Sequence, residues 1–306
     1  MTSSTLAIVC TVRDPSPSFL TWIEHHRQLV DRLYIYLDSP SEAAVTAIPT
    51  GPAICTFAGT ACSHFSGPSG VMQRQCQNVL DALMQCAKDG IDWLIHIDSD
   101  EMIFSPSLNL KSYFSQVNPA VSCIRFINHE VVSTYAAEDP FKELNVFKKN
   151  RHFNTVRDDS GCEEKIYFLG YTIGKSAVRV NQCVGPSGPH DFEVSGGQTI
   201  REEEICILHY LSATYKEWLK KFSELGDFQP FWFDDAQRPM HRSFLVESRN
   251  IFLESLQLGD WTRARDFYLN HLLSASDTKR LLEKGDLLFV DLFLKNNPLA
   301  VLEKQI

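Results

Sequence analysis

The sequence lacks paired CxxC spacings, an excess of basic residues and any long apolar run, and each absence excludes a class of protein. Its nine cysteines are scattered, so we expect buried free thiols in a reducing compartment rather than a disulfide framework or structural zinc. The net charge of −9 gives no broad attraction to nucleic acid or anionic membranes. No apolar run approaches the roughly 20 residues of a membrane helix, and the N-terminus lacks the pattern of a signal peptide. We therefore expect a cytoplasmic protein with no nucleic-acid partner and no membrane span.

Apolar, strand-like runs alternate with amphipathic segments in the first two-thirds of the chain. We expect helices over 16–29 and 71–87, where apolar residues recur at helical spacing. The predicted strands are 6–12, 32–39, 53–59, 93–98, 121–131, 177–180 and 205–211. This alternation predicts an α/β fold, a Rossmann-type mixed sheet flanked by helices, with ligands at the carboxyl ends of its strands.

The last third of the chain has a different texture and is predicted to be helical. The expected helices are 214–226, 242–257, 261–273, 277–284 and 286–295, with Ser276 and Asp277 as candidate N-caps. We therefore predict a ligand-binding and catalytic domain at 1–211 and a helical extension at 212–306 that packs on it.

The stretch "WLIHIDSDEMIF" (93–104) places three carboxylates in four positions at the end of a buried strand. Self-repulsion and desolvation oppose this arrangement unless positive charge lies nearby. Asp98 and Asp100 would direct hard oxygen ligands toward one spot, which suits Mn²⁺ or Mg²⁺. The plain alternative is a solvated turn rich in Asp and Ser, and Asp-x-Asp alone is a weak motif. The apolar residues on both sides favour the metal site.

Several stretches, taken in order, resemble the family-2-like and family-92-like glycosyltransferases. They are "VRDPSPSFLTWIEHHRQLVDRLYIYLDSPSE", "QRQCQNVLDALMQCAKDGIDWLIHIDSDEMIF", "IGKSAVRV", "GPHDF" and "ILHYLSATYKEWLKKF". The resemblance covers roughly residues 6–225. It departs from the family where Arg13 and Asp14 replace the usual Arg-Asn-Glu and where Met102 replaces an aromatic residue.

This resemblance implies a GT-A fold and a metal-dependent transfer of sugar from a nucleoside diphosphate sugar. A UDP-sugar is the expected donor, a saccharide or glycoconjugate is the expected acceptor, and inversion is the expected stereochemical outcome. Asp98 and Asp100 match the family's metal-binding pair. Glu101 would lie next to this pair without binding the metal directly. His209 matches the late histidine that completes such sites, although a histidine after an apolar strand can also be a packed core residue.

Other residues are candidates for the nucleotide-sugar pocket. Val12, Arg13, Asp14 and Asp38 match pocket-lining positions of the family at the ends of the first two strands. Their alternative role is to cap those strand ends. Asp98 is also expected near the ribose.

Basic and amide side chains add to this pocket. Gln73, Arg74 and Gln77 lie on one side of the helix before the acidic strand, where Arg74 could reach a phosphate or Asp98. Lys175 could contact the diphosphate. Arg74 and Lys175 could equally be ordinary solvated residues.

An inverting transfer also requires a base that takes the proton of the acceptor hydroxyl. Asp191, Glu163 and Glu164 lie on Gly-rich loops and are our candidates, together with Asp158 and Asp159. His190 could orient the acceptor. A retaining transfer would need no such base.

Two other functions remain open at this stage. A nucleotidyltransferase uses a similar sheet and paired carboxylates, but "CTVRDPSPS" lacks the early Gly-rich phosphate loop expected of one. The chain could also be a non-catalytic module that binds sugars or nucleotides.

Overall fold

A mixed β-sheet forms the centre of the computed structural model, which describes residues 3–38, 48–58, 70–106, 109–150, 155–157, 163–166, 168–228 and 244–293. The strands of this sheet are β1 (Leu6–Val12), β2 (Arg32–Leu37), β3 (Ile54–Ala58), β4 (Trp93–His96), β5 (Glu101–Phe104), β6 (Val121–Val131), β7 (Val146–Lys148), β10 (Lys175–Arg179), β13 (Gln198–His209) and β14 (Leu287–Phe289). Eight of these strands follow one another in the order β14-β7-β6-β10-β4-β1-β2-β3. The other two lie outside this order: β13 pairs with β6 and with β5. Two small sheets are formed by β8 (Thr155–Arg157) with β9 (Glu163–Ile166) and by β11 (Cys183–Pro186) with β12 (Phe192–Val194).

The strand directions confirm the predicted mixed α/β sheet. β1 runs parallel to β2 and β4, and β2 runs parallel to β3. β10 is antiparallel to both β4 and β6. Because β1 has β2 on one side and β4 on the other, the chain order reverses at β1. In open α/β sheets ligands bind at such a point, at the carboxyl ends of the strands.

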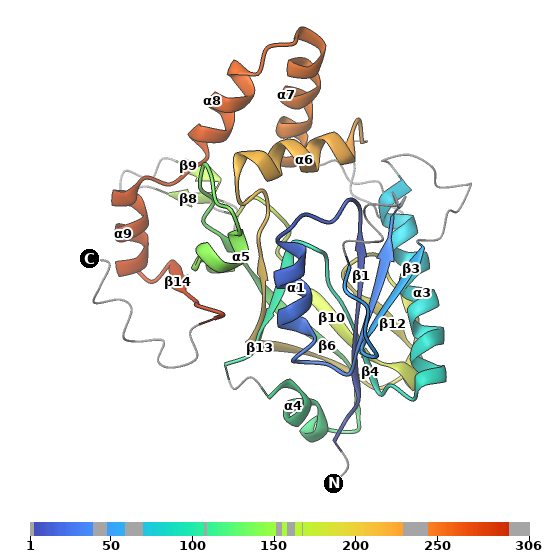
Figure 1. Cartoon of the computed structure of the whole chain (residues 1–306). Coiled ribbons are helices and arrows are strands. Elements are labelled where there is room, and N and C mark those ends of the chain that lie inside the picture. Colours follow the sequence, from blue (N-terminus) through green and yellow to red (C-terminus); the bar gives the residue numbers. More distant parts are fainter. Residues whose placement is uncertain are drawn as a thin grey trace.

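Helices cover both faces of the sheet. α1 (Phe19–His26) and α4 (Leu110–Gln116) pack on one face, and α3 (Val71–Asp89) packs on the other (Figure 1). Alternate residues of β1 divide between the faces: Leu6 and Ile8 join the core under α1, whereas Ala7 and Val9 join the core under α3. Since both faces are buried, β1 is apolar apart from Thr11, and this apolar run is the pattern that predicted it.

Four helices lie in the described C-terminal part of the chain; the first three form a third apolar cluster at one end of the sheet, and the last belongs to a separate small cluster with Phe168 and Leu287. The four helices are α6 (Tyr215–Leu225), α7 (Phe244–Leu258), α8 (Thr262–Asn270) and α9 (Ala275–Glu283). Trp218 and Phe222 of α6 are fully buried in the cluster formed with α7 and α8, which also includes Leu169 and Leu211. Figure 1 shows α6 lying across the end of the sheet and α7 and α8 extending beyond it.

The minor elements are a short α5 (Pro140–Glu143) and a 3-10 turn (Val180–Gln182). Among the described residues, no helix is both long and apolar enough to cross a membrane. The described cysteines carry free thiols, as expected, whereas Cys62 and Cys162 lie outside the described residues.

Two local predictions in the extension are wrong. The segment predicted as a helix over 286–295 contains β14, which pairs antiparallel with β7 and so belongs to the main sheet. Strand pairing supplies backbone hydrogen bonds that outweigh the helix propensity of this leucine-rich segment. The N-cap of α9 is Ser274, whose side chain accepts a hydrogen bond from the Asp277 amide, rather than Ser276 or Asp277. The domain boundary at residue 212 stays a prediction.

Candidate functional site

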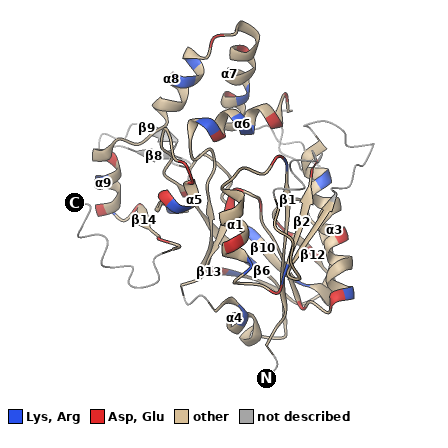
Figure 2. Cartoon of the chain, in the orientation of Figure 1, with Lys and Arg blue, Asp and Glu red and all other residues tan. Residues whose placement is uncertain are grey.

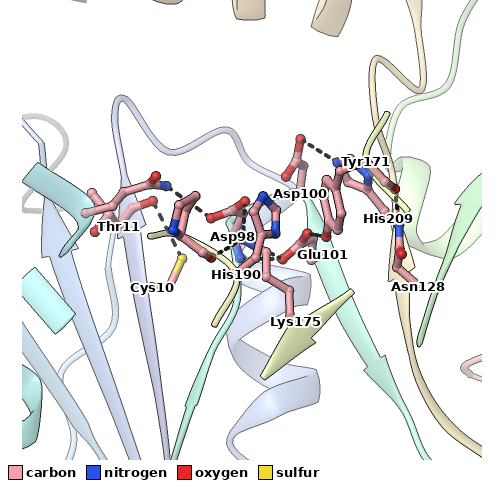
Figure 3. Close-up of polar contacts among 12 residues, drawn as sticks. Cys10, Thr11, Asp98, Asp100, Glu101, Asn128, Tyr171, Lys175, His190 and His209 are labelled. Atoms are coloured by element: carbon pink, nitrogen blue, oxygen red, sulfur yellow. Dashed lines mark hydrogen bonds and ion pairs between the residues drawn. The ribbon is translucent and has the colours of Figure 1, made fainter. Parts of the chain in front are cut away.

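The acidic stretch forms a turn between β4 and β5, at the carboxyl end of β4. β4 ends at His96, two residues earlier than predicted, and Asp98, Ser99 and Asp100 lead directly into β5, which begins at Glu101. Figure 3 shows that Asp98 and Asp100 contact different partners, whereas Asp98 and Glu101 both lie near Lys175.

Helix α1 fixes the position of β5 and therefore of the acidic turn. The Trp22 indole N–H donates to the Glu101 carbonyl at 2.7 Å, and the Ile103 amide donates to His26 Nε2 at 3.1 Å. His26 Nδ1 contacts the Trp22 carbonyl at 2.8 Å, so the proton resides on Nδ1. Burial lowers the pKa of His26 well below its usual value, which keeps the ring neutral and this pairing intact. Through Trp22 and His26, the sequence pattern Trp-Ile-x-His-His thus holds the backbone of β5 in place.

Asp98 is neutralised by a lysine of β10. Lys175 Nζ lies 2.7 Å from Asp98 Oδ2, and the Lys175 side chain is fully buried. Gln75 of α3 donates to the other carboxylate oxygen at 3.0 Å. Burial alone would raise the pKa of Asp98, but the nearby Lys175 ammonium outweighs it and the pKa is lowered. Asp98 is therefore held as an anion with both oxygens engaged.

Asp100 faces a different set of partners. Lys221 of α6 places Nζ 2.9 Å from Asp100 Oδ2, and His209 at the end of β13 places Nε2 3.6 Å from the same oxygen. Burial opposes ionisation, yet Lys221 and His209 together hold the pKa of Asp100 well below its usual value. Burial also lowers the pKa of His209, but the Asp100 carboxylate outweighs this effect and the net shift is upward.

Glu101 is the buried member of the trio. Its side chain has no exposed surface, and its Oε2 accepts a hydrogen bond from the Asp98 amide at 2.7 Å. Tyr171 donates its hydroxyl to Oε1, and Lys175 Nζ is 3.7 Å from Oε2. Burial raises the pKa of Glu101 to about 7, even though Lys175 acts to lower it. Glu101 therefore holds the backbone of the turn through the Asp98 amide.

Tyr171 belongs to a loop that other buried groups hold in place. Its ring lies 4.2 Å from the His190 ring and 5.0 Å from the His209 ring, centre to centre. The buried Glu130 carboxylate accepts hydrogen bonds from the Leu169 and Gly170 amides, the latter at 2.7 Å. Because these bonds fix the loop backbone, they also fix the Tyr171 ring beside the acidic turn.

The end of β2 carries a second buried ion pair. Asp38 accepts two hydrogen bonds from Arg74 of α3, at 2.6 and 2.8 Å, in a bidentate geometry. Arg13, at the end of β1, has Nε 3.5 Å from Asp38 Oδ2 and is a quarter exposed. The predicted contact of Arg74 with Asp98 is absent among the described contacts, because Arg74 binds Asp38 instead.

The structure brings most of the predicted residues to the carboxyl ends of β1, β2 and β4. These residues are Val12, Arg13, Asp14, Asp38, Arg74, Asp98, Asp100, Lys175 and His209. Asp14 has a positive φ of 43°, an uncommon conformation for a residue other than glycine, and its carbonyl accepts a hydrogen bond from Lys220 of α6.

The remaining predicted residues lie apart from this group. Gln73 and Gln77 are on the exposed face of α3, whereas Gln75, on the opposite side of the helix, makes the contact with Asp98. Asp191 pairs with Arg125 and accepts a hydrogen bond from Ser176 at 3.1 Å.

The structure describes only some of the other loop residues that we predicted as candidates for the catalytic base. Glu163 and Glu164 begin β9, where the backbone alone is described. Asp158 and Asp159 lie outside the described residues. The choice of Asp191, Glu163 or Glu164 as a base stays a prediction.

Sequence reasoning missed Gln75, Tyr171 and Lys221. Lys221 had a usable signal, because it lies three residues after Trp218 and next to Phe222, and both aromatic residues are on the buried face of α6. Tyr171 had none, since an isolated tyrosine in a Gly-rich segment has no distinguishing pattern.

Asp100 and His209 are the residues that fit a divalent cation. Ligand atoms bound at about 2.1 Å to one ion lie roughly 3.0 Å apart at octahedral angles and about 3.4 Å apart at tetrahedral angles, and the observed 3.6 Å between Asp100 Oδ2 and His209 Nε2 is a few tenths of an ångström wider. An imidazole nitrogen suits Mn²⁺ better than Mg²⁺, which prefers oxygen ligands. Within the described part of the chain, no group of three or more His, Cys, Asp or Glu side chains is arranged to hold a metal. Asp98 would have to release Lys175 or Gln75 to serve as a third ligand.

Comparison with known proteins gives relatives that share only part of their length with this chain. No protein-family model matches it. One glycosyltransferase-like protein of Arabidopsis thaliana is 27% identical over 167 residues, which is 50% of this chain and 32% of that protein. A second glycosyltransferase-like protein of the same plant is 27% identical over 230 residues, 69% of this chain and 49% of that protein. The chain thus spans about a third to a half of the length of these curated relatives.

Solved structures show a weaker likeness. A Pyrobaculum calidifontis mannosyltransferase in complex with GDP-Man and Mn²⁺ superposes with a TM-score of 0.41 and 9% identity, over 93% of this chain and 80% of that chain. A mannose-1-phosphate geranyltransferase from Thermus thermophilus superposes with a TM-score of 0.31 and 11% identity, over 58% of each chain. Likenesses at these TM-scores are too low to establish a shared fold. The curated relatives therefore supply the functional comparison: this chain is similar, over part of their length, to proteins named glycosyltransferase-like.

Proposed function

We propose that this chain transfers a glycosyl group from a nucleoside diphosphate sugar to a hydroxyl group of a saccharide or glycoconjugate, with Mn²⁺ or Mg²⁺. The observation that carries the proposal is the position of Asp38, Asp98 and Asp100, which follow the carboxyl ends of β2 and β4 on the two sides of the switch point of a mixed α/β sheet. The similarity to proteins named glycosyltransferase-like supports the same reaction class.

The residues at these strand ends suit a nucleotide sugar in two ways. Asp100 and His209 would hold the cation, which when bound would neutralise the charge that develops on the departing nucleoside diphosphate. Arg13 and Asp38, at the ends of β1 and β2, present donor and acceptor groups for the base or ribose. Uridine diphosphate is our first choice for the nucleotide.

The buried pairs around the acidic turn give this arrangement rigidity. Lys175 keeps Asp98 ionised, and Glu101 fixes the backbone of the turn through the Asp98 amide. An arrangement set before the substrate binds avoids reorganisation during the reaction. The GT-A assignment, the inverting outcome and a base among Asp191, Glu163 and Glu164 belong to this proposal as expectations.

The test is sugar transfer and donor hydrolysis from UDP- and GDP-sugars, with Mn²⁺ and with EDTA, by wild type and Asp100→Asn. The loss of an outer-sphere partner of a metal site typically costs about 10- to 100-fold, so the loss of a ligand should reduce activity by about 100-fold or more. Asp227→Asn, which alters an exposed carboxylate, should behave as wild type. Full activity of Asp100→Asn in EDTA would refute metal-dependent transfer. Formation of a nucleotide sugar and pyrophosphate from UTP or GTP and a sugar 1-phosphate, with no sugar transfer from UDP- or GDP-sugars, would indicate a nucleotidyltransferase.

A further inference from the structure

Two consecutive lysines of α6 reach the residues that follow β1 and β4. Lys220 donates a hydrogen bond to the Asp14 carbonyl, just beyond the end of β1. Lys221 donates to Asp100 Oδ2 at 2.9 Å, just beyond the end of β4. Figure 2 shows the basic residues on α6 where the helix crosses the end of the sheet. α6 therefore delivers positive charge to the place where Asp100 would bind a cation.

The backbone of α6 is fixed, whereas the Lys221 side chain can move. Thr214 caps the helix by accepting a hydrogen bond from the Glu217 amide at 3.2 Å, and the Trp218 indole donates to Ser248 Oγ at 2.9 Å. The Lys221 side chain is 28% exposed, and its four-carbon stem is flexible. The ammonium can therefore leave Asp100 while the helix stays in place.

Three acidic groups at the strand ends already have basic partners. Asp98 is paired with Lys175, Asp100 with Lys221, and Asp38 with Arg74. A divalent cation bound to Asp100 Oδ2 would lie within a few ångströms of the Lys221 ammonium at its present position. Repulsion between like charges rises as their separation falls, so the cation and Lys221 cannot share this oxygen. A nucleoside diphosphate would add negative charge, so that the cation and the Lys221 ammonium could both bind close to Asp100.

We propose that Lys221 and the divalent cation are alternative partners of the Asp100 carboxylate, and that Lys221 moves to a phosphate oxygen of the donor when the cation binds. This inference rests on the proposed function. Lys221 is then a diphosphate-binding residue that pairs with Asp100 in the absence of the cation. It follows that the cation binds weakly alone and tightly with the nucleoside diphosphate, and by linkage each increases the affinity for the other.

The proposal predicts opposite effects of one substitution on two affinities. Removal of the Lys221 ammonium frees Asp100, so Lys221→Met should bind Mn²⁺ alone about tenfold more tightly than wild type. The same variant loses a charge-assisted hydrogen bond to phosphate, so in saturating Mn²⁺ it should bind UDP or GDP about tenfold more weakly. A residue that merely stabilised the fold would not strengthen one affinity while it weakened the other.

Isothermal titration calorimetry measures both affinities without any turnover. Mn²⁺ is titrated into the nucleotide-free protein, and UDP and GDP are then titrated separately in saturating Mn²⁺. Lys221→Arg keeps the charge and should restore both affinities in part, and Lys221→Gln repeats the test if Lys221→Met does not fold. Lys216→Met, the same change at an exposed position of α6, should match wild type.

The possible failures are distinguishable. Suppose that wild type binds UDP or GDP in the presence of Mn²⁺. If Lys221→Met and Lys221→Gln then bind Mn²⁺ no more tightly than wild type, or bind the nucleotide no more weakly, the exchange is overturned. The proposed function stands in that case. If wild type binds neither nucleotide in the presence of Mn²⁺, the proposed function falls and this inference falls with it.

Discussion

The substitution Glu101→Gln should change the pH dependence of stability in a way that can be worked out from the structure. The Glu101 side chain is fully buried, accepts a hydrogen bond from the Asp98 amide, and contacts the Tyr171 hydroxyl. A glutamine of nearly the same shape can accept from the same amide, and its NH₂ group can donate to the Tyr171 oxygen. The substitution therefore keeps both contacts and removes the ionisable group.

The sign of the effect follows from the direction of the pKa shift. Burial raises the pKa of Glu101 from 4.5 to about 7 in the folded protein, so the fold favours the protonated carboxyl group. The stabilisation is complete below the unfolded pKa, near 4.5, and it is lost as pH rises through about 7. A tenfold change in proton affinity corresponds to about 1.4 kcal/mol. Between about pH 5 and pH 8, wild type should therefore lose about 2 to 3 kcal/mol that Glu101→Gln retains.

Urea unfolding followed by tryptophan fluorescence measures this difference. Wild type and Glu101→Gln are compared at about pH 5 and about pH 8 in EDTA, and the free energy of unfolding is obtained by linear extrapolation. Relative to wild type, the variant should be more stable at pH 8 than at pH 5 by about 2 to 3 kcal/mol. Glu203→Gln, at a side chain that is 69% exposed, should show no such change. An identical difference between wild type and Glu101→Gln at both pH values would refute the raised pKa of Glu101.

Two further substitutions test the framework of the site. Arg74→Met leaves the buried Asp38 carboxylate without its bidentate partner and should lower the free energy of unfolding by about 3 to 5 kcal/mol; a loss below about 1 kcal/mol in urea unfolding would show that the pair is not a buried ion pair. Gly174→Ala should be more damaging than Gly188→Ala, because both glycines have positive φ but only at Gly174 would a Cβ atom lie 1.9 Å from the Phe126 carbonyl oxygen. Equal thermal stability of these two variants would contradict the close approach at Gly174.

The local secondary structure of the chain could be predicted because it depends on residues that are close together in the sequence. The apolar run of β1 is buried on both faces, and α3 shows its buried residues at helical spacing. Asp38 and Asp98 were placed at strand ends for the same reason, since polar residues follow directly where a buried strand stops. The sheet and the acidic edge were thus accessible from the sequence.

Contacts between distant segments were not accessible in this way. The sequence predicted α1 as a helix, but not that His26 would accept a hydrogen bond from the Ile103 amide, 77 residues further on. It predicted a helix over 286–295, where pairing with β7 produces β14. In both cases a partner far along the chain determines the outcome.

The sequence by itself determined that three carboxylates stand together at the end of a buried strand and that positive charge must compensate them. The tertiary structure decided which groups supply it: Lys175, 77 residues from Asp98, and Lys221, 121 residues from Asp100. The physical reason is that the two effects depend on different distances, one along the chain and one in space. Burial leaves a periodic pattern in neighbouring residues, whereas an ammonium group stabilises a carboxylate most strongly within a few ångströms, and only the order of the strands and the position of α6 bring these groups so close.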